Sequence, residues 1–152
     1  MNPQNYPLAS PSDRIVAGII DLIVAGVIQS VLYFSLWVIG LFWLSGFLAV
    51  SYLIFRDSFA FLNYQSIGKK IIKLKVLKKK GAGPLDFKES FKRNLIFLPN
   101  LLNSFGFTLV YAAGTITLIL LIFELYKLYN SSENQRFGDE LAETIVVKES
   151  IS

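Results

Sequence analysis

The sequence predicts an all-α integral membrane protein, built from a helical hairpin, one or two further membrane helices and a small cytoplasmic two-stranded β element. An uninterrupted apolar stretch runs from Ile15 to Phe55, with Asp21 as its single charged residue. As a helix it would be about 60 Å long, roughly twice the ~30 Å hydrocarbon core of a bilayer, so we expect it to cross, turn and cross back. Basic residues then gather between Arg56 and Arg93, and two short β-type runs lie outside the apolar segments.

The composition argues against several classes of chemistry. The chain has no cysteine and no histidine, so it lacks disulfides, thiol nucleophiles, the usual zinc and haem ligands, and the usual general base at neutral pH. No nucleophile motif, metal cluster or cofactor loop can be assembled from the remaining residues. We therefore expect no enzyme activity, no cofactor and no metal site.

The chain is expected to open with a flexible tail, because residues 1–9 are polar and contain prolines. They lack the basic region of a signal peptide, and the apolar run that follows is too long for one. A helix start comes next, with Ser10 as the N-cap, Pro11 in the first turn and Asp13 three residues after the cap. A single membrane domain is predicted over residues 10–148.

The hairpin is predicted to cross the membrane at about residues 14–36 and again at about 41–56, turning near Gly40. Trp37 and Trp43 lie on either side of this turn. Indole rings favour the membrane interface, so the turn should emerge there.

The segment after the hairpin predicts the orientation. Eleven of the fifteen basic residues lie between Arg56 and Arg93, and by the positive-inside rule the loop of residues 57–90 is cytoplasmic. Two crossings before it place the N-terminus on the cytoplasmic side of the inner or plasma membrane. Within the loop, the alternation over residues 72–76 predicts a strand, and Asp86 with Glu89 predicts a capped helix start.

Two arrangements are open for the uncharged stretch from Leu95 to Phe123. One is a single long helix that crosses once. The other is a short or re-entrant membrane helix at about residues 91–105, followed by a full crossing at about 107–129. Pro99 interrupts a single helix, so we favour the second.

The second β-type run, residues 144–147, bears on the same question. A lone strand is unstable in water, and its best partner is the strand at residues 72–76. Pairing requires the C-terminus on the cytoplasmic side and therefore an even number of membrane segments. We favour four segments over three.

Asp21 is the first candidate functional residue. A carboxylate at the centre of a membrane helix costs about 2.5–3.5 kcal/mol on insertion scales, so it indicates a proton or cation site, or an anchor for a basic partner. It could also lie close enough to the interface to be solvated. Arg14 is two turns earlier on the same face, about 10 Å from Asp21 along the helix axis. Side chains on a helix point toward its N-terminus, so the Arg14 side chain should point away from Asp21. A third group or water should bridge them, and Asp139 is the candidate. Alternatively, Arg14 is only a basic anchor at the membrane edge.

Taken together, these residues resemble the RDD family of small membrane proteins. The resemblance rests on Arg14, on Asp21 within Ile20-Asp21-Leu22, on the segment Gln65-Ser66-Ile67-Gly68-Lys69-Lys70, and on the tail Arg136–Val147. It covers roughly residues 8–148 and differs at Glu143, where the family more often has glycine. The family is named for one arginine and two aspartates, which the resemblance places at Arg14, Asp21 and Asp139. It implies a multi-pass membrane protein, and a transport role, including sodium/proton exchange, has been suggested for some members.

Other polar residues suggest accessory roles. Glu124 and Lys127 have the i, i+3 spacing of a helix ion pair, or Glu124 faces the bundle interior and shares cations with Asp21. The segment with Gln65, Ser66 and Gly68 is not a phosphate-binding loop, because it lacks that loop's first glycine and final Ser or Thr. A turn at the membrane edge explains it better.

The lysine cluster fixes topology and would contact anionic lipid headgroups. Its members are Lys69, Lys70, Lys78, Lys79 and Lys80. Membrane lipids are the expected partners, together with a second copy or another membrane protein, and we expect no nucleic-acid binding.

Two functions follow. One is an ion- or proton-coupled transport component, with Asp21 as the titrating carboxylate and Arg14 and Asp139 tuning it. The other is a non-catalytic membrane scaffold or accessory subunit, in which these residues form a structural clasp.

Overall fold

The computed structural model describes residues 6–80, 83–105 and 107–149, and it is mostly helical. The elements, in chain order, are α1 (Pro11–Trp37), α2 (Leu44–Phe55), η2 (Ala60–Leu62), α3 (Ile67–Ile71), β1 (Leu74–Lys78), α4 (Phe87–Arg93), η3 (Leu95–Phe105), α5 (Phe107–Asn130), α6 (Phe137–Leu141) and β2 (Thr144–Lys148).

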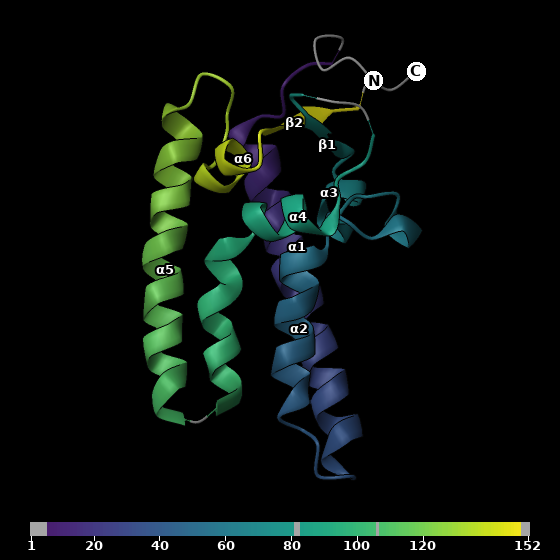
Figure 1. The fold of residues 1–152 in the computed structure, drawn as a ribbon, viewed down its shortest axis with the longest axis vertical. Helices are drawn as coiled ribbons and strands as arrows, with labels where there is room; N and C mark the ends of the chain where they lie inside the picture. The colour runs from purple at the N-terminus through teal and green to yellow at the C-terminus, as the bar shows by residue number, and fades with distance from the viewer. Residues whose placement is uncertain (1–5, 81–82, 106, 150–152) are drawn as a thin grey trace.

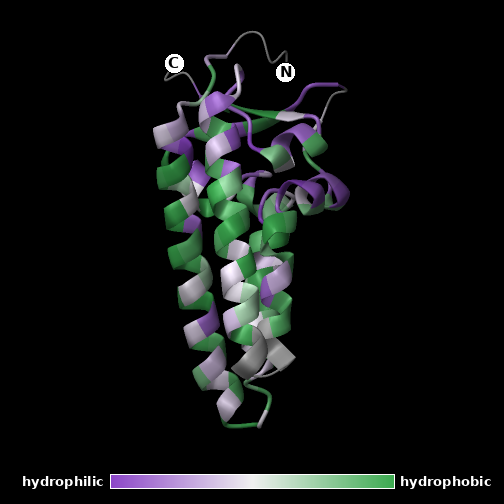
Figure 2. Ribbon diagram, turned by 90° about the vertical axis from the view of Figure 1, so that its left-hand side faces the viewer, coloured by the Kyte–Doolittle hydropathy of each residue, from purple (hydrophilic) through white to green (hydrophobic). Residues whose placement is uncertain are grey.

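The molecule is an elongated bundle with two unlike ends (Figure 1). Helices α1, α2, η3 and α5 run along its length. Helices α3, α4 and α6 and the two strands gather at one end, which we call the polar end. The opposite end carries the turn between α1 and α2, and we call it the far end. Hydrophobic residues follow the helices, whereas hydrophilic residues concentrate at the polar end (Figure 2).

Two helices in the described part of the chain are long and apolar enough to span a membrane. They are α1 and residues Val110–Asn130 of α5. A third span results if Leu44–Phe55 and Ala60–Ile71, bent by 61° at the break between them, count as one. These elements support the predicted helical membrane fold, while the number of crossings stays a prediction.

The start of α1 and its turn form as predicted. Ser10 accepts a hydrogen bond from the Asp13 backbone N–H at 3.1 Å, and Pro11 occupies the first turn. After Trp37 the chain turns with Gly40 at φ +73°, a left-handed conformation that glycine adopts without steric cost. Helix α2 begins at Leu44, slightly later than predicted.

The second half of the bundle follows the broken arrangement. The Asp86–Glu89 capping box opens α4 as predicted. Pro99 lies within η3, and the chain then reverses so that η3 and α5 lie side by side (Figure 1). The stretch from Leu95 to Phe123 is therefore not one long helix.

The predicted strand pairing is confirmed, with one strand displaced. β1 and β2 are antiparallel, and Val76 lies opposite Val146. The first strand occupies residues 74–78 rather than 72–76, because Lys73 adopts a positive φ of 57° that interrupts an extended chain.

The predicted flexible tail is wrong for residues 7–9. Leu8 forms a bridge with Val147, and the Ala9 N–H donates to the Val146 carbonyl at 3.0 Å. This segment covers the free edge of β2. Ala9 is fully buried and joins Ala17, Leu74 and Val146 in a small apolar core at the polar end.

A buried charge network at the polar end

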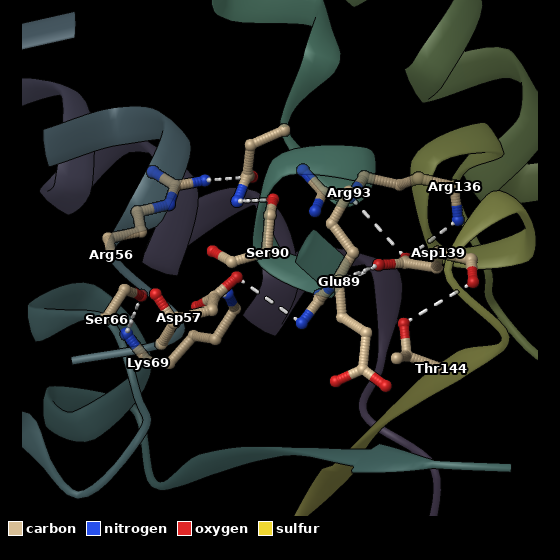
Figure 3. A network of polar contacts seen from close by, with 12 residues as sticks. Arg56, Asp57, Ser66, Lys69, Glu89, Ser90, Arg93, Arg136, Asp139 and Thr144 are labelled. Carbon is tan, nitrogen blue, oxygen red and sulfur yellow. Dashed lines mark hydrogen bonds and ion pairs between the residues drawn. The ribbon is translucent and has the colours of Figure 1, made fainter. Parts of the chain in front are cut away.

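Charged side chains accumulate inside the polar end, where the helices converge (Figure 3). The described part of the chain buries eight of them: Arg14, Asp21, Arg56, Asp57, Lys69, Arg93, Glu124 and Asp139. They come from α1, α3, α4, α5, α6 and the residues that follow α2. Buried charges require partners because desolvation is costly, so each contact in this network has structural weight.

Asp139 is the best-paired carboxylate. Its Oδ2 forms an ion pair with the Arg14 Nη2, and its Oδ1 accepts from the Arg93 Nε at 3.0 Å and Nη2 at 2.8 Å. Arg136 contributes a backbone N–H at 3.0 Å and its Nε at 3.6 Å. Figure 3 shows Asp139 between Arg93 and Arg136. Although burial opposes ionisation, Arg14, Arg93 and Arg136 hold the pKa of Asp139 well below its usual range.

Helix α6 brings Asp139 into this position because Gly138 permits close packing on α4. A Cβ at residue 138 would lie 2.1 Å from the Arg93 carbonyl oxygen. The Gly138 N–H also donates to Glu124 Oε1 of α5 at 3.2 Å. The C-terminal segment that contains α6 is therefore attached to α1, α4 and α5.

Asp21 has different partners from those predicted. Its Oδ1 accepts from the Gly68 N–H at 2.8 Å, and its Oδ2 lies 3.2 Å from the Arg56 Nη1. Arg56 also contacts Asn94 Oδ1 at 3.4 Å and lies over the Phe97 ring, 5.4 Å from its centroid. Asp21 is thus neutralised by Arg56, at the end of α2.

The prediction that Asp139 bridges Arg14 and Asp21 is therefore wrong. Arg14 does point away from Asp21, as expected, and it binds Asp139 and the Asn134 carbonyl. The three predicted residues are brought to the same end of the bundle, but they belong to two separate clusters. One contains Asp21 and the other contains Arg14 and Asp139.

A third carboxylate, Asp57, was missed by the sequence reasoning. Its Oδ1 binds the Lys69 Nζ at 2.5 Å, and its Oδ2 lies 3.3 Å from the Arg93 Nη1. Arg93 therefore joins Asp57 to Asp139. The sequence feature that could have indicated Asp57 is its position beside Arg56, directly after an apolar membrane segment. The positive-inside rule explains basic residues at such a position but does not explain an acidic one.

Lys69 corrects the headgroup prediction. It is buried against Asp57 and is not exposed to lipid headgroups. Lys70 is exposed. Each of the other three lysines has an acidic partner: Glu89 for Lys78, Glu133 for Lys79 and Glu143 for Lys80. Headgroup contacts of Lys70, Lys78, Lys79 and Lys80 stay predictions.

The segment that contains Gly68 forms a capped helix start. Ser66 accepts from the Lys69 N–H at 3.3 Å, and the Gln65 side chain donates to Glu149 at 3.1 Å. A Cβ on Gly68 would lie 2.0 Å from the Ala17 carbonyl oxygen. Only glycine allows α3 to approach α1 closely enough for its backbone to bind Asp21.

The predicted Glu124–Lys127 ion pair is wrong. Lys127 instead binds Glu140 at 2.9 Å. Glu124 is buried, and its Oε2 has no hydrogen-bond partner among the described residues. With Asp21 it lines a cavity of about 290 Å³ that also borders Arg14, Arg56, Lys69 and Arg136. This placement matches the alternative in which Glu124 faces the interior with Asp21.

No group of three or more potential metal-ligating side chains occurs within residues 6–80, 83–105 and 107–149. The arrangement is one of carboxylates fixed by arginines and backbone N–H groups. Its evident chemistry is the mutual neutralisation of charges that connect distant parts of the chain.

Comparison with known protein families identifies the family of this chain. The model of the RDD family matches residues 8–143. The comparisons with curated proteins and with solved structures gave no match. The family match covers most of the chain and includes Arg14, Asp21 and Asp139, so this chain belongs to the RDD family and is a membrane protein.

Proposed function

We propose that this chain is a non-catalytic scaffold or accessory subunit of the inner or plasma membrane, and that its charge network is a structural clasp. The observation that carries the proposal is Asp139. This tail residue is fully buried and is held by Arg14 of α1, Arg93 of α4 and Arg136 beside it.

The membrane setting explains why such a clasp is useful. Lipid tails are as apolar as leucine, so the hydrophobic effect does little to hold one membrane helix against another. Ion pairs in a dry site provide directional contacts instead, and losing one partner leaves a costly unpaired charge. The clasp thereby holds the two-stranded sheet in one position relative to α1 and α4.

The electrostatics of Asp139 support a clasp over proton transfer. A group that carries protons works best when its pKa lies near the ambient pH. The surrounding arginines hold the pKa of Asp139 well below that range. Asp139 therefore remains ionised at physiological pH, as a permanent ion pair requires.

We further propose a multi-pass topology with the polar end on the cytoplasmic side. Single cysteines at Gly40, Gly83 and Ser132 of this cysteine-free chain would test it with a membrane-impermeant thiol reagent. All three positions are exposed. We expect external labelling at Gly40 alone, and external labelling at Gly83 or Ser132 would contradict the topology.

A transport component is the second candidate, favoured by the cavity that Asp21 and Glu124 share. At 152 residues the chain would need to oligomerise to enclose a path. Proton and sodium flux should be measured in reconstituted vesicles for wild type, Asp21→Asn and Glu124→Gln.

The clasp predicts no flux in wild type and a lower melting temperature for Asp21→Asn, because Arg56 would lose its buried partner. Wild-type flux that Asp21→Asn or Glu124→Gln abolishes without a change in melting temperature would establish transport and refute the clasp.

A further inference from the structure

A cleft separates α1 from α5 below the charge network. It has a volume of about 290 Å³, and its apolar walls include Ile15, Ile19, Leu22, Leu118, Ile122 and Leu125. The walls reach the outer surface of the helices, because Ile19 is 51% and Ile122 is 60% exposed. In a membrane, these exposed positions face the hydrocarbon of the bilayer.

One end of the cleft is lined by charged groups with a small excess of positive charge, because Arg14, Arg56 and Lys69 are each paired with a carboxylate. Four basic side chains (Arg14, Arg56, Lys69 and Arg136) and two acidic ones (Asp21 and Glu124) border it. The basic groups lie toward the polar end of the bundle, where the headgroup region would be, and the apolar walls extend away from it. A ligand that fits must be apolar along most of its length and anionic at one end.

Two polar groups in this cleft have unused hydrogen-bonding capacity. The Arg136 side chain is 17% exposed and contacts Asp139 through Nε. Within the described residues, its terminal nitrogens make no hydrogen bond, and the guanidinium interacts electrostatically with Asp139 and with Glu124. Glu124 Oε2 is buried without a donor from any described residue. An unsatisfied buried oxygen of this kind is unfavourable unless a donor reaches it.

We propose that this cleft binds one anionic phospholipid, with its phosphate at Arg136 and an acyl chain between α1 and α5. An arginine fork matches phosphate oxygens in geometry and charge. Basic pockets between membrane helices are suited to anionic lipid headgroups. A headgroup hydroxyl would donate a hydrogen bond to Glu124 Oε2. The site goes beyond the clasp and requires only that α1 and α5 lie in a membrane.

The test uses delipidated full-length protein in detergent and measures lipid retention by native mass spectrometry. Phosphatidylglycerol is the probe, because it combines an anionic phosphate with headgroup hydroxyls. Phosphatidylcholine with the same acyl chains is the comparison. We expect wild type to prefer phosphatidylglycerol by about tenfold, the effect of one charge-assisted contact.

Two variants separate headgroup from chain recognition. Arg136→Gln should bind the two lipids about equally. Gly18→Leu should weaken retention of both, because Gly18 lines the cleft and a Cβ there meets no atom within 4 Å. The leucine side chain would occupy the space proposed for the acyl chain. The helix should still form, because leucine has a higher helix propensity than glycine.

Matched controls lie outside the cleft. Lys88→Gln removes the same charge from an exposed site on α4, and Gly26→Leu adds the same side chain farther along α1, also without a steric neighbour. Both should bind lipid like wild type. The proposal would be overturned if wild type retained the two lipids equally or if Gly18→Leu bound phosphatidylglycerol as wild type does. It would also be overturned if inorganic phosphate alone raised the melting temperature as much as phosphatidylglycerol does.

Discussion

The two halves of α1 show how differently the polar end and the far end are specified. All four of its buried residues lie within its first fifteen positions, nearer the polar end: Arg14, Ala17, Asp21 and Ala25. Their spacing of three or four residues places them on one face. Beyond Ala25 the helix is largely exposed and apolar, with Val31 at 59% and Phe34 at 73%.

This contrast identifies what fixes the fold. Lipid solvates the exposed far end about as well as another helix would, so packing there gives little preference for one arrangement. At the polar end each buried charge except Glu124 is paired with an oppositely charged residue of another segment, and exchanging partners would leave charges unpaired. Changes at the polar end should therefore be costly, and changes at the far end should be nearly neutral.

The largest effect is expected for Asp139→Asn. The substitution keeps the shape of the side chain but leaves Arg14, Arg93 and Arg136 without the carboxylate that they share. Breaking a buried pair costs about 3–5 kcal/mol. We expect a large fall in melting temperature in detergent. In limited proteolysis, the C-terminal segment with α6 and β2 should be cleaved earlier than the long helices.

Glu143→Gln is the matched control in the same tail. Its carboxylate pairs with Lys80, and both side chains are more than half exposed. Surface pairs contribute about 0–1 kcal/mol, so its melting temperature should stay close to wild type. Equal effects of the two substitutions would show that Asp139 is not the centre of the clasp.

A smaller effect is expected for Gly68→Ala, which tests the contact between α3 and α1. The added Cβ would lie 2.0 Å from the Ala17 carbonyl oxygen, so the helices must separate and Asp21 loses a backbone donor. Overpacking of this kind costs about 1–3 kcal/mol. Gly26→Ala, which has open space around the new Cβ, should be neutral or slightly stabilising in a melting experiment.

The sequence was most informative where local chemistry determines structure. The caps at Ser10 and Asp86 and the pairing of the two β-type runs were predictable, because each depends on nearby residues or on a single available partner. The cost of a lone charge in lipid left two positions open for Asp21, one paired inside the protein and one solvated at the interface, and the structure has it buried and paired.

The arginine partners of the buried carboxylates, Arg56 for Asp21 and Arg93 for Asp57 and Asp139, were not predictable from the sequence. Arg56 and Arg93 are two among many basic residues in a segment whose charge is already explained by topology. Only the bend after α2 and the approach of α4 select them over the neighbouring lysines. Likewise, the pairing of Pro7–Ala9 with β2 could not be predicted, because backbone pairing with an existing strand requires no particular side-chain pattern.

The pH dependence of stability should also come from the polar end. The pKa of Asp139 is lower in the folded protein than its unfolded value of about 3.9, so its contribution is complete above that pH and is lost as pH falls below it. One such carboxyl adds a slope of about 1.4 kcal/mol per pH unit in that window. Melting curves between about pH 6 and about pH 3 would measure it.

Glu143→Gln should show the same slope as wild type, because its exposed surface pair holds little of the stability. Stability that stays flat below about pH 4 would mean that the folded state does not depend on ionised Asp139.

The smallest effect is expected at the far end, for Val31→Leu. This side chain is 59% exposed on a helix that is long and apolar enough to span a membrane, so lipid surrounds it in the monomer. Surface substitutions of this kind change stability by about 0.5 kcal/mol or less, and the melting temperature should not move measurably. A loss as large as that of Gly68→Ala would mean that this face is packed in the membrane, and the oligomeric state of the variant in detergent would then show whether a second copy covers it. The far end would in that case be specified by an interface between chains, and the contrast with the polar end would hold only within one subunit.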